Sequence, residues 1–147
     1  MDRGRRLAFD FGDVRIGIAV SDQDSILASP VVTLETRSIN LWDEIFALLG
    51  EFQPIALYVG RPIHLGGQES LSANKAEIFA KELEERFDLP TFLIDERLST
   101  VSAQRQLREI GKSTRAGRKN IDQMAAVEIL NLALEIEKTR DRDRLDK

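Results

Sequence analysis

The sequence predicts a single α/β domain. Stretches in which apolar residues alternate with smaller ones, as in strands, take turns with stretches in which apolar residues recur every three or four positions, as in amphipathic helices. Of the 147 residues, 42% are apolar, which is enough for one sizeable core. The chain shows neither an internal repeat nor a linker. We therefore expect one domain over residues 1–138, followed by a frayed, charged tail over residues 139–147.

The chain begins with a predicted β-hairpin over residues 7–22. Apolar residues occupy alternate positions up to a turn at Gly12, and the alternation resumes at Ile16. Residues 26–35 give a third strand, and Pro30 within it predicts an edge position or a bulge, because proline cannot donate to the ladder. The sheet therefore starts with three antiparallel strands.

A helix and a buried strand come next. Ser38 or Asn40 can cap a helix that runs to about Glu51, and Pro54 precedes a short, continuously apolar strand over residues 55–59. A helix between two strands indicates a crossover that joins parallel neighbours. The sheet is therefore expected to be mixed.

The second half of the chain continues the alternation. An amphipathic helix over residues 71–87 leads to a strand over residues 91–96, which ends in two adjacent carboxylates. We expect a helix over residues 99–110, a loop over residues 111–119 and a long, well-buried helix over residues 120–138. Strand ends are where α/β proteins build their sites, so the two carboxylates are candidate site residues.

Composition excludes several kinds of chemistry. The chain has no cysteine and one histidine, which argues against disulfides, thiolate catalysis, Cys/His zinc sites and a serine-histidine-aspartate triad. No run approaches the roughly 20 apolar residues of a membrane span, and no signal-peptide core follows the first residues. We therefore expect a cytoplasmic protein in which oxygen ligands would hold any metal ion, and such ligands favour Mg²⁺ or Mn²⁺.

One segment is basic although the formal net charge of the chain is −4. Residues 105–119 contain only one acidic residue, Glu109, and several cations, namely Arg105, Arg108, Lys112, Arg115, Arg118 and Lys119. This segment can face a polyanion, and it can equally be a solvated basic loop.

Three acidic positions are unusual for ordinary packing. Asp10 lies inside the first strand, Asp95 and Glu96 end the last one, and Asp122 shares a helix face with two small alanines. Carboxylates on rigid elements can hold divalent ions that activate water against a phosphodiester. Structural alternatives stay open, because Asp122 can interact with the helix dipole, and Asp95 or Glu96 can pair with an arginine.

Four segments, in this order and spacing, resemble the bacterial YqgF family. They read DFGDVRIGIAVSD over residues 10–22, VGRP over 59–62, DERLST over 95–100 and KNIDQMAA over 119–126. The family consists of RNase H-like nucleases described as Holliday junction resolvases or as nucleases of pre-16S ribosomal RNA. The chain departs from the family pattern at Asp13, where a small hydroxyl residue is typical, and at Arg61, where an apolar residue is usual.

The resemblance implies a fold, a site and an activity. The fold is RNase H-like, with a five-stranded mixed sheet and helices on both faces. The catalytic and metal-binding triad falls on Asp10, Glu96 and Asp122, with Mg²⁺ or Mn²⁺ as cofactor and a 5′ phosphate as product. The candidate contacts to nucleic acid are Arg15, Arg61, Arg97, Lys112, Arg115, Arg118 and Lys119.

Several functions remain open at this stage. The resemblance favours processing of the 5′ end of pre-16S ribosomal RNA, with ribosomal particles as possible partners and either a monomer or a homodimer as the active form. A junction resolvase would act as a symmetric dimer on four-way DNA. A non-catalytic RNA-binding module for ribosome assembly is a third class. The Asp-x-Gly turn also resembles that of actin-like kinases, but those need two such domains.

Overall fold

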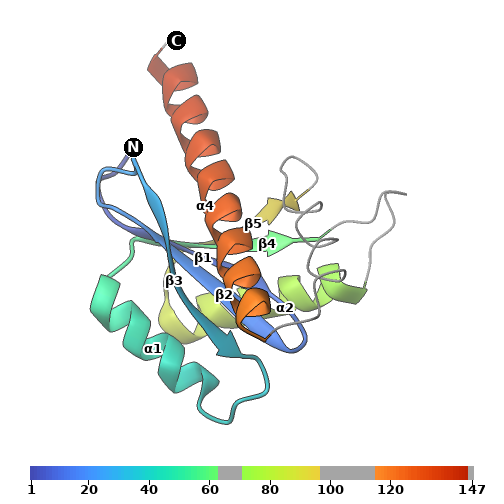
Figure 1. The fold of residues 1–147 in the computed structure, drawn as a ribbon. Coiled ribbons are helices and arrows are strands. Elements are labelled where there is room, and N and C mark those ends of the chain that lie inside the picture. The colour runs from blue at the N-terminus through green and yellow to red at the C-terminus, as the bar shows by residue number, and fades with distance from the viewer. Residues whose placement is uncertain (63–70, 97–114, 146–147) are drawn as a thin grey trace.

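The computed structural model describes residues 1–62, 71–96 and 115–145 and contains the expected five-stranded mixed sheet. The strands are β1 (Arg6–Phe11), β2 (Arg15–Ser21), β3 (Ala28–Glu35), β4 (Ala56–Arg61) and β5 (Thr91–Asp95). Their order in the sheet is β3-β2-β1-β4-β5 (Figure 1). The first three strands pair antiparallel, whereas β4 lies parallel to β1 and to β5.

Pro30 has the position that the sequence predicts. It lies in β3, which is an edge strand, and it pairs with Ala19 directly after a register shift between Ile18 and Ala19. On its outer side an edge strand has no neighbour that would need the N–H that proline lacks. The register shift accommodates proline on the side that faces β2.

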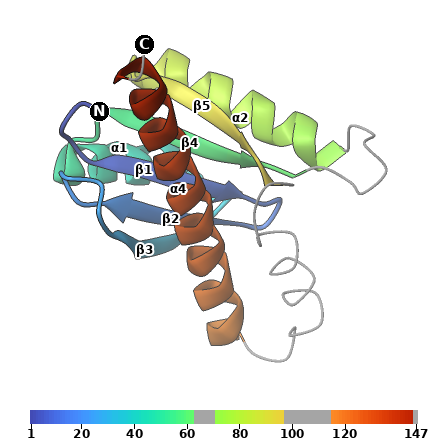
Figure 2. The same cartoon turned by 90° about the horizontal axis from the view of Figure 1, so that it is seen from above.

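Helices cover both faces of the sheet (Figure 2). The larger core lies between one face and the helices α1 (Leu41–Phe52) and α2 (Leu71–Phe87), where Phe9, Ile18 and Leu57 meet apolar side chains of both helices. On the other face α4 (Arg115–Leu145) crosses the sheet. Successive strand residues point to opposite faces, so the hairpin residues supply both cores.

The face under α4 is lined by small residues. Ala8, Ala19 and Ala56 of the sheet meet Ala125, Ala126 and Ala133 of the helix, and all of them are buried. Small side chains let the helix backbone approach the strands closely. Polar groups placed at this contact are therefore withdrawn from water and held near one another.

Both predicted ends of the last helix are wrong. The helix begins at Arg115, so part of the expected loop over residues 111–119 is helical, and it continues to Leu145 through the expected frayed tail. Gly117 lies in the first turn, where glycine disrupts few helical hydrogen bonds. At the other end, residues 139–145 contain neither Gly nor Pro, and the N-terminal ammonium of Met1 forms an ion pair with Asp141.

Other predictions fall outside the described residues. The expected helix over residues 99–110 and the start of the loop after it lie there. Within the described ranges, no helix combines the length and the apolar character that crossing a bilayer requires.

Candidate active site

Asp10 lies under α4, near the carboxyl end of β1. Strand alternation puts it on the same face as Ala8, which packs against α4. Asp10 is only 1% exposed to solvent. A carboxylate that is buried in this way is costly unless cations or hydrogen-bond donors surround it, so the environment of Asp10 indicates what the position is for.

Glycines stand beside Asp10 on both neighbouring strands. Gly17 of β2 is its partner in the antiparallel register. On the other side, Gly60 of β4 follows Val59, the parallel partner of Phe9, so Gly60 is level with Asp10. Adjacent strands lie only about 4.8 Å apart. Neither neighbour carries a side chain that could cover the Asp10 carboxylate.

The same two glycines touch the other two acidic residues. A Cβ atom at Gly17 would lie 2.0 Å from the backbone oxygen of Asp122, and one at Gly60 would lie 2.6 Å from Glu96 Oε1. The first contact is with the backbone of α4, which therefore rests directly on β2. Asp10, Glu96 and Asp122 thus lie beside two strand positions, Gly17 and Gly60, that carry no side chain. We call these three acidic residues the acidic cluster.

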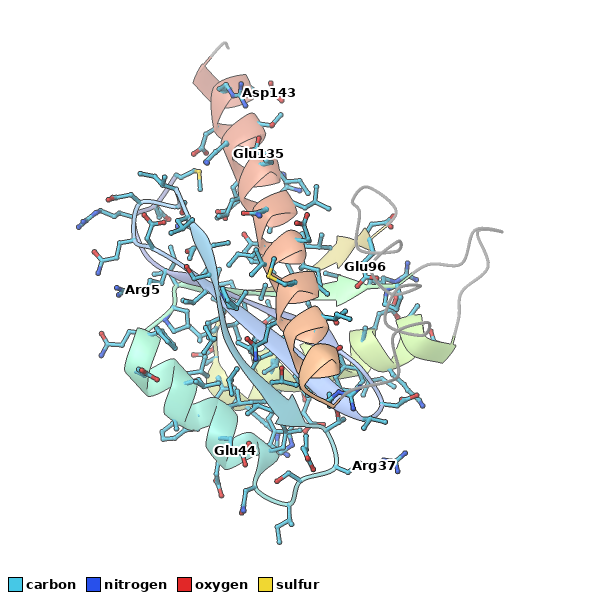
Figure 3. All side chains as sticks on the ribbon, in the orientation of Figure 1. Arg5, Arg37, Glu44, Glu96, Glu135 and Asp143 are labelled. Atoms are coloured by element: carbon cyan, nitrogen blue, oxygen red, sulfur yellow. The ribbon has the colours of Figure 1, made fainter. Side chains whose placement is uncertain are left out.

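Burial sets the acidic cluster apart from the surface acids. Glu96 is fully buried and Asp122 is 4% exposed. Figure 3 shows Glu96 just past the end of β5, beside the end of β4. Asp122 lies two turns inside α4, and the first turn of that helix contains no acidic residue. Since helix-dipole stabilisation fades beyond the first turn, it does not explain Asp122.

The two adjacent carboxylates at the end of β5 have different surroundings. Glu96 joins the acidic cluster, whereas Asp95 lines a cavity of about 410 Å³ between β5 and the second half of α4, together with Tyr58 and Glu137. Residue types alone left open which of the two carboxylates belongs to the site. The structure places Glu96, not Asp95, beside Gly60.

Two of the predicted phosphate contacts are engaged in ion pairs. Arg15 Nε donates to Asp122 Oδ2 over 2.9 Å, and Arg61 Nε donates to Glu77 Oε1 over 2.6 Å. The partner of Arg15 is thus the carboxylate of Asp122 on α4. The other candidates give no side-chain geometry: Arg97 and Lys112 lie outside the described residues, as do the side chains of Arg115, Arg118 and Lys119.

The two departures from the family pattern both have partners on α2. Asp13, in the turn after β1, accepts a hydrogen bond from Lys75 Nζ at 2.8 Å, and Arg61 pairs with Glu77. Lys75 and Glu77 are two residues apart, so the two pairs hold the start of α2 to the carboxyl ends of β1 and β4. These contacts join residues far apart in the sequence, and no local pattern signals them.

The donor chemistry of the acidic cluster fits a hard divalent ion. Carboxylate oxygens are the ligands that Mg²⁺ and Mn²⁺ prefer, and each of the three comes from a different element. Among residues with described side chains, however, no three acidic or imidazole groups form a ready-made metal-binding group. The Arg15 guanidinium holds Asp122 Oδ2.

Sequence reasoning found the acids but missed the glycines beside them. Gly17 lies inside β2 and Gly60 near the end of β4, and a glycine within a strand marks close approach of another group. That signal was available from the sequence, although the identity of the approaching groups was not.

Known proteins resemble this chain over nearly its full length. A family model described as "RuvX: Holliday junction resolvase" matches residues 4–136. A protein of Streptomyces coelicolor named "Putative pre-16S rRNA nuclease" is 44% identical over 144 residues, which cover 97% of this chain and 86% of that protein. A protein of Rhodococcus erythropolis with the same name is 46% identical over 134 residues, which cover 87% and 76% of the two chains.

A solved structure shares the fold. Thermus thermophilus RuvC, in complex with a Holliday junction substrate, superposes on this chain with a TM-score of 0.57. The match covers 92% of this chain and 96% of the RuvC chain. The sequence identity is 14%, so the likeness concerns the fold alone. RuvC has an RNase H-like fold, and the expectation of that fold is confirmed.

Proposed function

The chain belongs to the RuvX family, and on that premise we propose that it is a divalent-metal-dependent endonuclease that processes the 5′ end of pre-16S ribosomal RNA. The observation that carries the proposal is the acidic cluster. Three buried acidic residues from β1, the end of β5 and α4 lie beside Gly17 and Gly60, Asp122 through its backbone and Glu96 through its carboxylate. Family membership indicates a hydrolase of phosphodiester bonds, and the acidic cluster supplies groups suited to that reaction.

We assign Asp10, Glu96 and Asp122 as the catalytic residues and as the residues that would hold Mg²⁺ or Mn²⁺. The bound ions would activate water and stabilise the departing 3′ oxygen. The chain itself contributes rigidity, because two of the carboxylates stand on elements of the sheet and the third on a helix pressed against it. It also excludes water, which strengthens every electrostatic interaction in the site.

Cations around the site would bind the sugar-phosphate backbone. Arg15 begins β2 and Arg61 ends β4, so both lie at the edge of the sheet where β1 ends. The backbone at the start of α4 brings Arg115, Arg118 and Lys119 to the end of the helix nearer Asp122. Together with Arg97 and Lys112 they are the proposed contacts to phosphate, and binding through them would weaken as salt rises.

RNA is the substrate that the names of the similar proteins favour. Curated relatives with about 45% identity carry the name of a pre-16S ribosomal RNA nuclease. The second candidate is resolution of four-way DNA, which the family description and the likeness to RuvC favour. We propose the cytoplasm as the site of action, with ribosomal particles as partners and either a monomer or a homodimer as the active form.

Cleavage assays distinguish these functions. End-labelled 16S precursor RNA and a synthetic four-way DNA junction are incubated with Mg²⁺, Mn²⁺ or EDTA. Wild type is compared with Asp10→Asn and with Asp24→Asn, a control that neutralises an exposed aspartate. We expect metal-dependent cutting of the RNA that Asp10→Asn abolishes and Asp24→Asn leaves unchanged.

Other outcomes have defined meanings. Cutting of the junction alone would select the resolvase function. Binding of RNA without cleavage, and equally by wild type and Asp10→Asn, would favour a non-catalytic module for ribosome assembly and would overturn the nuclease proposal.

A further inference from the structure

Arg15 holds one member of the acidic cluster. Its Nε donates to Asp122 Oδ2 at 2.9 Å, and the side chains of Arg15 and Asp122 are 23% and 6% exposed. The Arg15 side chain is therefore more exposed to water than the carboxylate with which it pairs.

A guanidinium in this position opposes a divalent ion in two ways. It uses a lone pair on Asp122 Oδ2, and that oxygen is one of the few donors that Asp122 can offer a metal ion. It also brings a positive charge into a partly buried region, where charges are screened much less than in bulk water. Both effects lower the affinity of the acidic cluster for a second cation.

We propose that Arg15 is a built-in competitor of the divalent ion for Asp122 and sets the metal affinity of the acidic cluster. This inference rests on the proposed function, since it takes the acidic cluster to be the metal site. Binding of the ion displaces the guanidinium from Oδ2. Because Arg15 is already partly exposed, the displaced side chain can move into solvent at the mouth of the site without repacking of the core.

A supporting role for Arg15 predicts the opposite sign. Carboxylates that bind metals are often held in place by hydrogen bonds from neighbouring groups, and removal of such a group weakens metal binding. Competition instead predicts tighter binding when the charge of Arg15 is removed. The direction of the change in metal affinity therefore decides between the two roles.

The test measures Mn²⁺ binding by titration calorimetry on the full chain, without substrate. Arg15→Gln keeps a hydrogen-bond donor and removes the charge, whereas Arg15→Lys keeps the charge. Arg3→Gln is the matched control, because Arg3 Nε also donates to an aspartate over 2.9 Å but lies on the surface, away from the acidic cluster. Circular dichroism establishes that each variant is folded.

We expect Arg15→Gln to bind Mn²⁺ about tenfold more tightly than wild type, the scale set by one hydrogen bond to a charged group. Arg15→Lys is expected near the wild-type affinity, and Arg3→Gln is expected to match it. Unchanged or weaker binding by Arg15→Gln would overturn the competition. That result would leave the proposed function standing as long as wild type cleaves RNA with Mn²⁺, whereas absence of metal-dependent cleavage by wild type would overturn the proposed function itself.

Discussion

Helix α4 contributes to two groups of charged residues where it packs on the sheet. One group is the acidic cluster, near the start of the helix. The other, about 22 Å further along the helix, joins Arg6 of β1 to Glu137 of α4 by two hydrogen bonds of 3.1 Å each. Arg6 also donates to the carbonyl of Gly4 and to the hydroxyl of Ser25. We call Arg6, Glu137, Ser25 and Tyr58 the balanced cluster, because its main charges are paired one to one.

The two clusters differ in how their charges are compensated. In the balanced cluster a guanidinium meets a carboxylate with two parallel contacts, which is the most favourable geometry for such a pair. The acidic cluster instead gathers three carboxylates, with Arg15 as a partner of one. The paired charges of the balanced cluster support the fold, whereas we propose that the acidic cluster binds metal ions. The two clusters should therefore respond differently to mutation.

The largest effect on stability is expected for Arg6→Met. The change leaves Glu137 partly buried without its guanidinium, and breaking a buried ion pair from one side costs about 3–5 kcal/mol. Urea denaturation measures the loss. Arg3→Met, which breaks the exposed pair with Asp24, should cost no more than about 1 kcal/mol. Equal losses in the two variants would show that the balanced cluster contributes no more than a surface pair.

Gly17→Ala tests the close approach of α4 to the sheet. The new methyl group would meet the backbone of Asp122 at 2.0 Å, so the helix must shift, and overpacking of this kind costs about 1–3 kcal/mol. Cleavage should fall as well, because Asp122 moves with the helix. In the control Gly50→Ala, nothing lies within 4 Å of the new methyl group, and a helical glycine is replaced, which should stabilise the protein by about 1 kcal/mol. Unimpaired cleavage by Gly17→Ala would argue against our placement of Asp122.

The smallest effect concerns Tyr58 and alkaline pH. Burial, with the Glu137 carboxylate beside it, raises the pKa of Tyr58 well above its ordinary value of 10.0. Above about pH 10 the unfolded chain loses this proton while the folded chain keeps it, so stability should fall as pH rises. Tyr58→Phe should remove part of that fall. The check is the unfolding temperature of both proteins, measured from about pH 9 to about pH 11, a range that brackets the ordinary pKa of tyrosine. An equal fall of the unfolding temperature with pH in the two proteins would contradict this prediction.

The sequence predicted more of the fold than of the contacts. Alternation at positions 7–22 indicated the hairpin, and Pro30 indicated the edge strand, because both follow from local geometry. Residue types identified Asp10, Asp122 and either Asp95 or Glu96 as unusual, and the family resemblance selected Glu96. The structure places Glu96 beside Gly60 and Asp122 beside Gly17. The pairs of Arg15 with Asp122 and of Arg6 with Glu137 join positions 107 and 131 residues apart. No period in a single sequence reports such distant pairs.

The ends of α4 show a second limit. The cations and glycines of residues 111–119 are typical of a loop, and the mixed charges of residues 139–147 are typical of a frayed end. At the second end the helix continues to Leu145, and Met1 forms an ion pair with Asp141 there. Local composition could not report this contact because the two residues lie far apart in the sequence.

The most direct test of the difference between the clusters is the unfolding free energy of Asp10→Asn in EDTA and in Mn²⁺. In EDTA the variant gives the stability of the site without metal, because Asn keeps the size of the side chain and removes its charge. Saturating Mn²⁺ should stabilise wild type by about 3 kcal/mol when the ion is at roughly 100 times its Kd, and should stabilise Asp10→Asn far less. An unchanged response to Mn²⁺ in Asp10→Asn would contradict the assignment of the acidic cluster to metal binding.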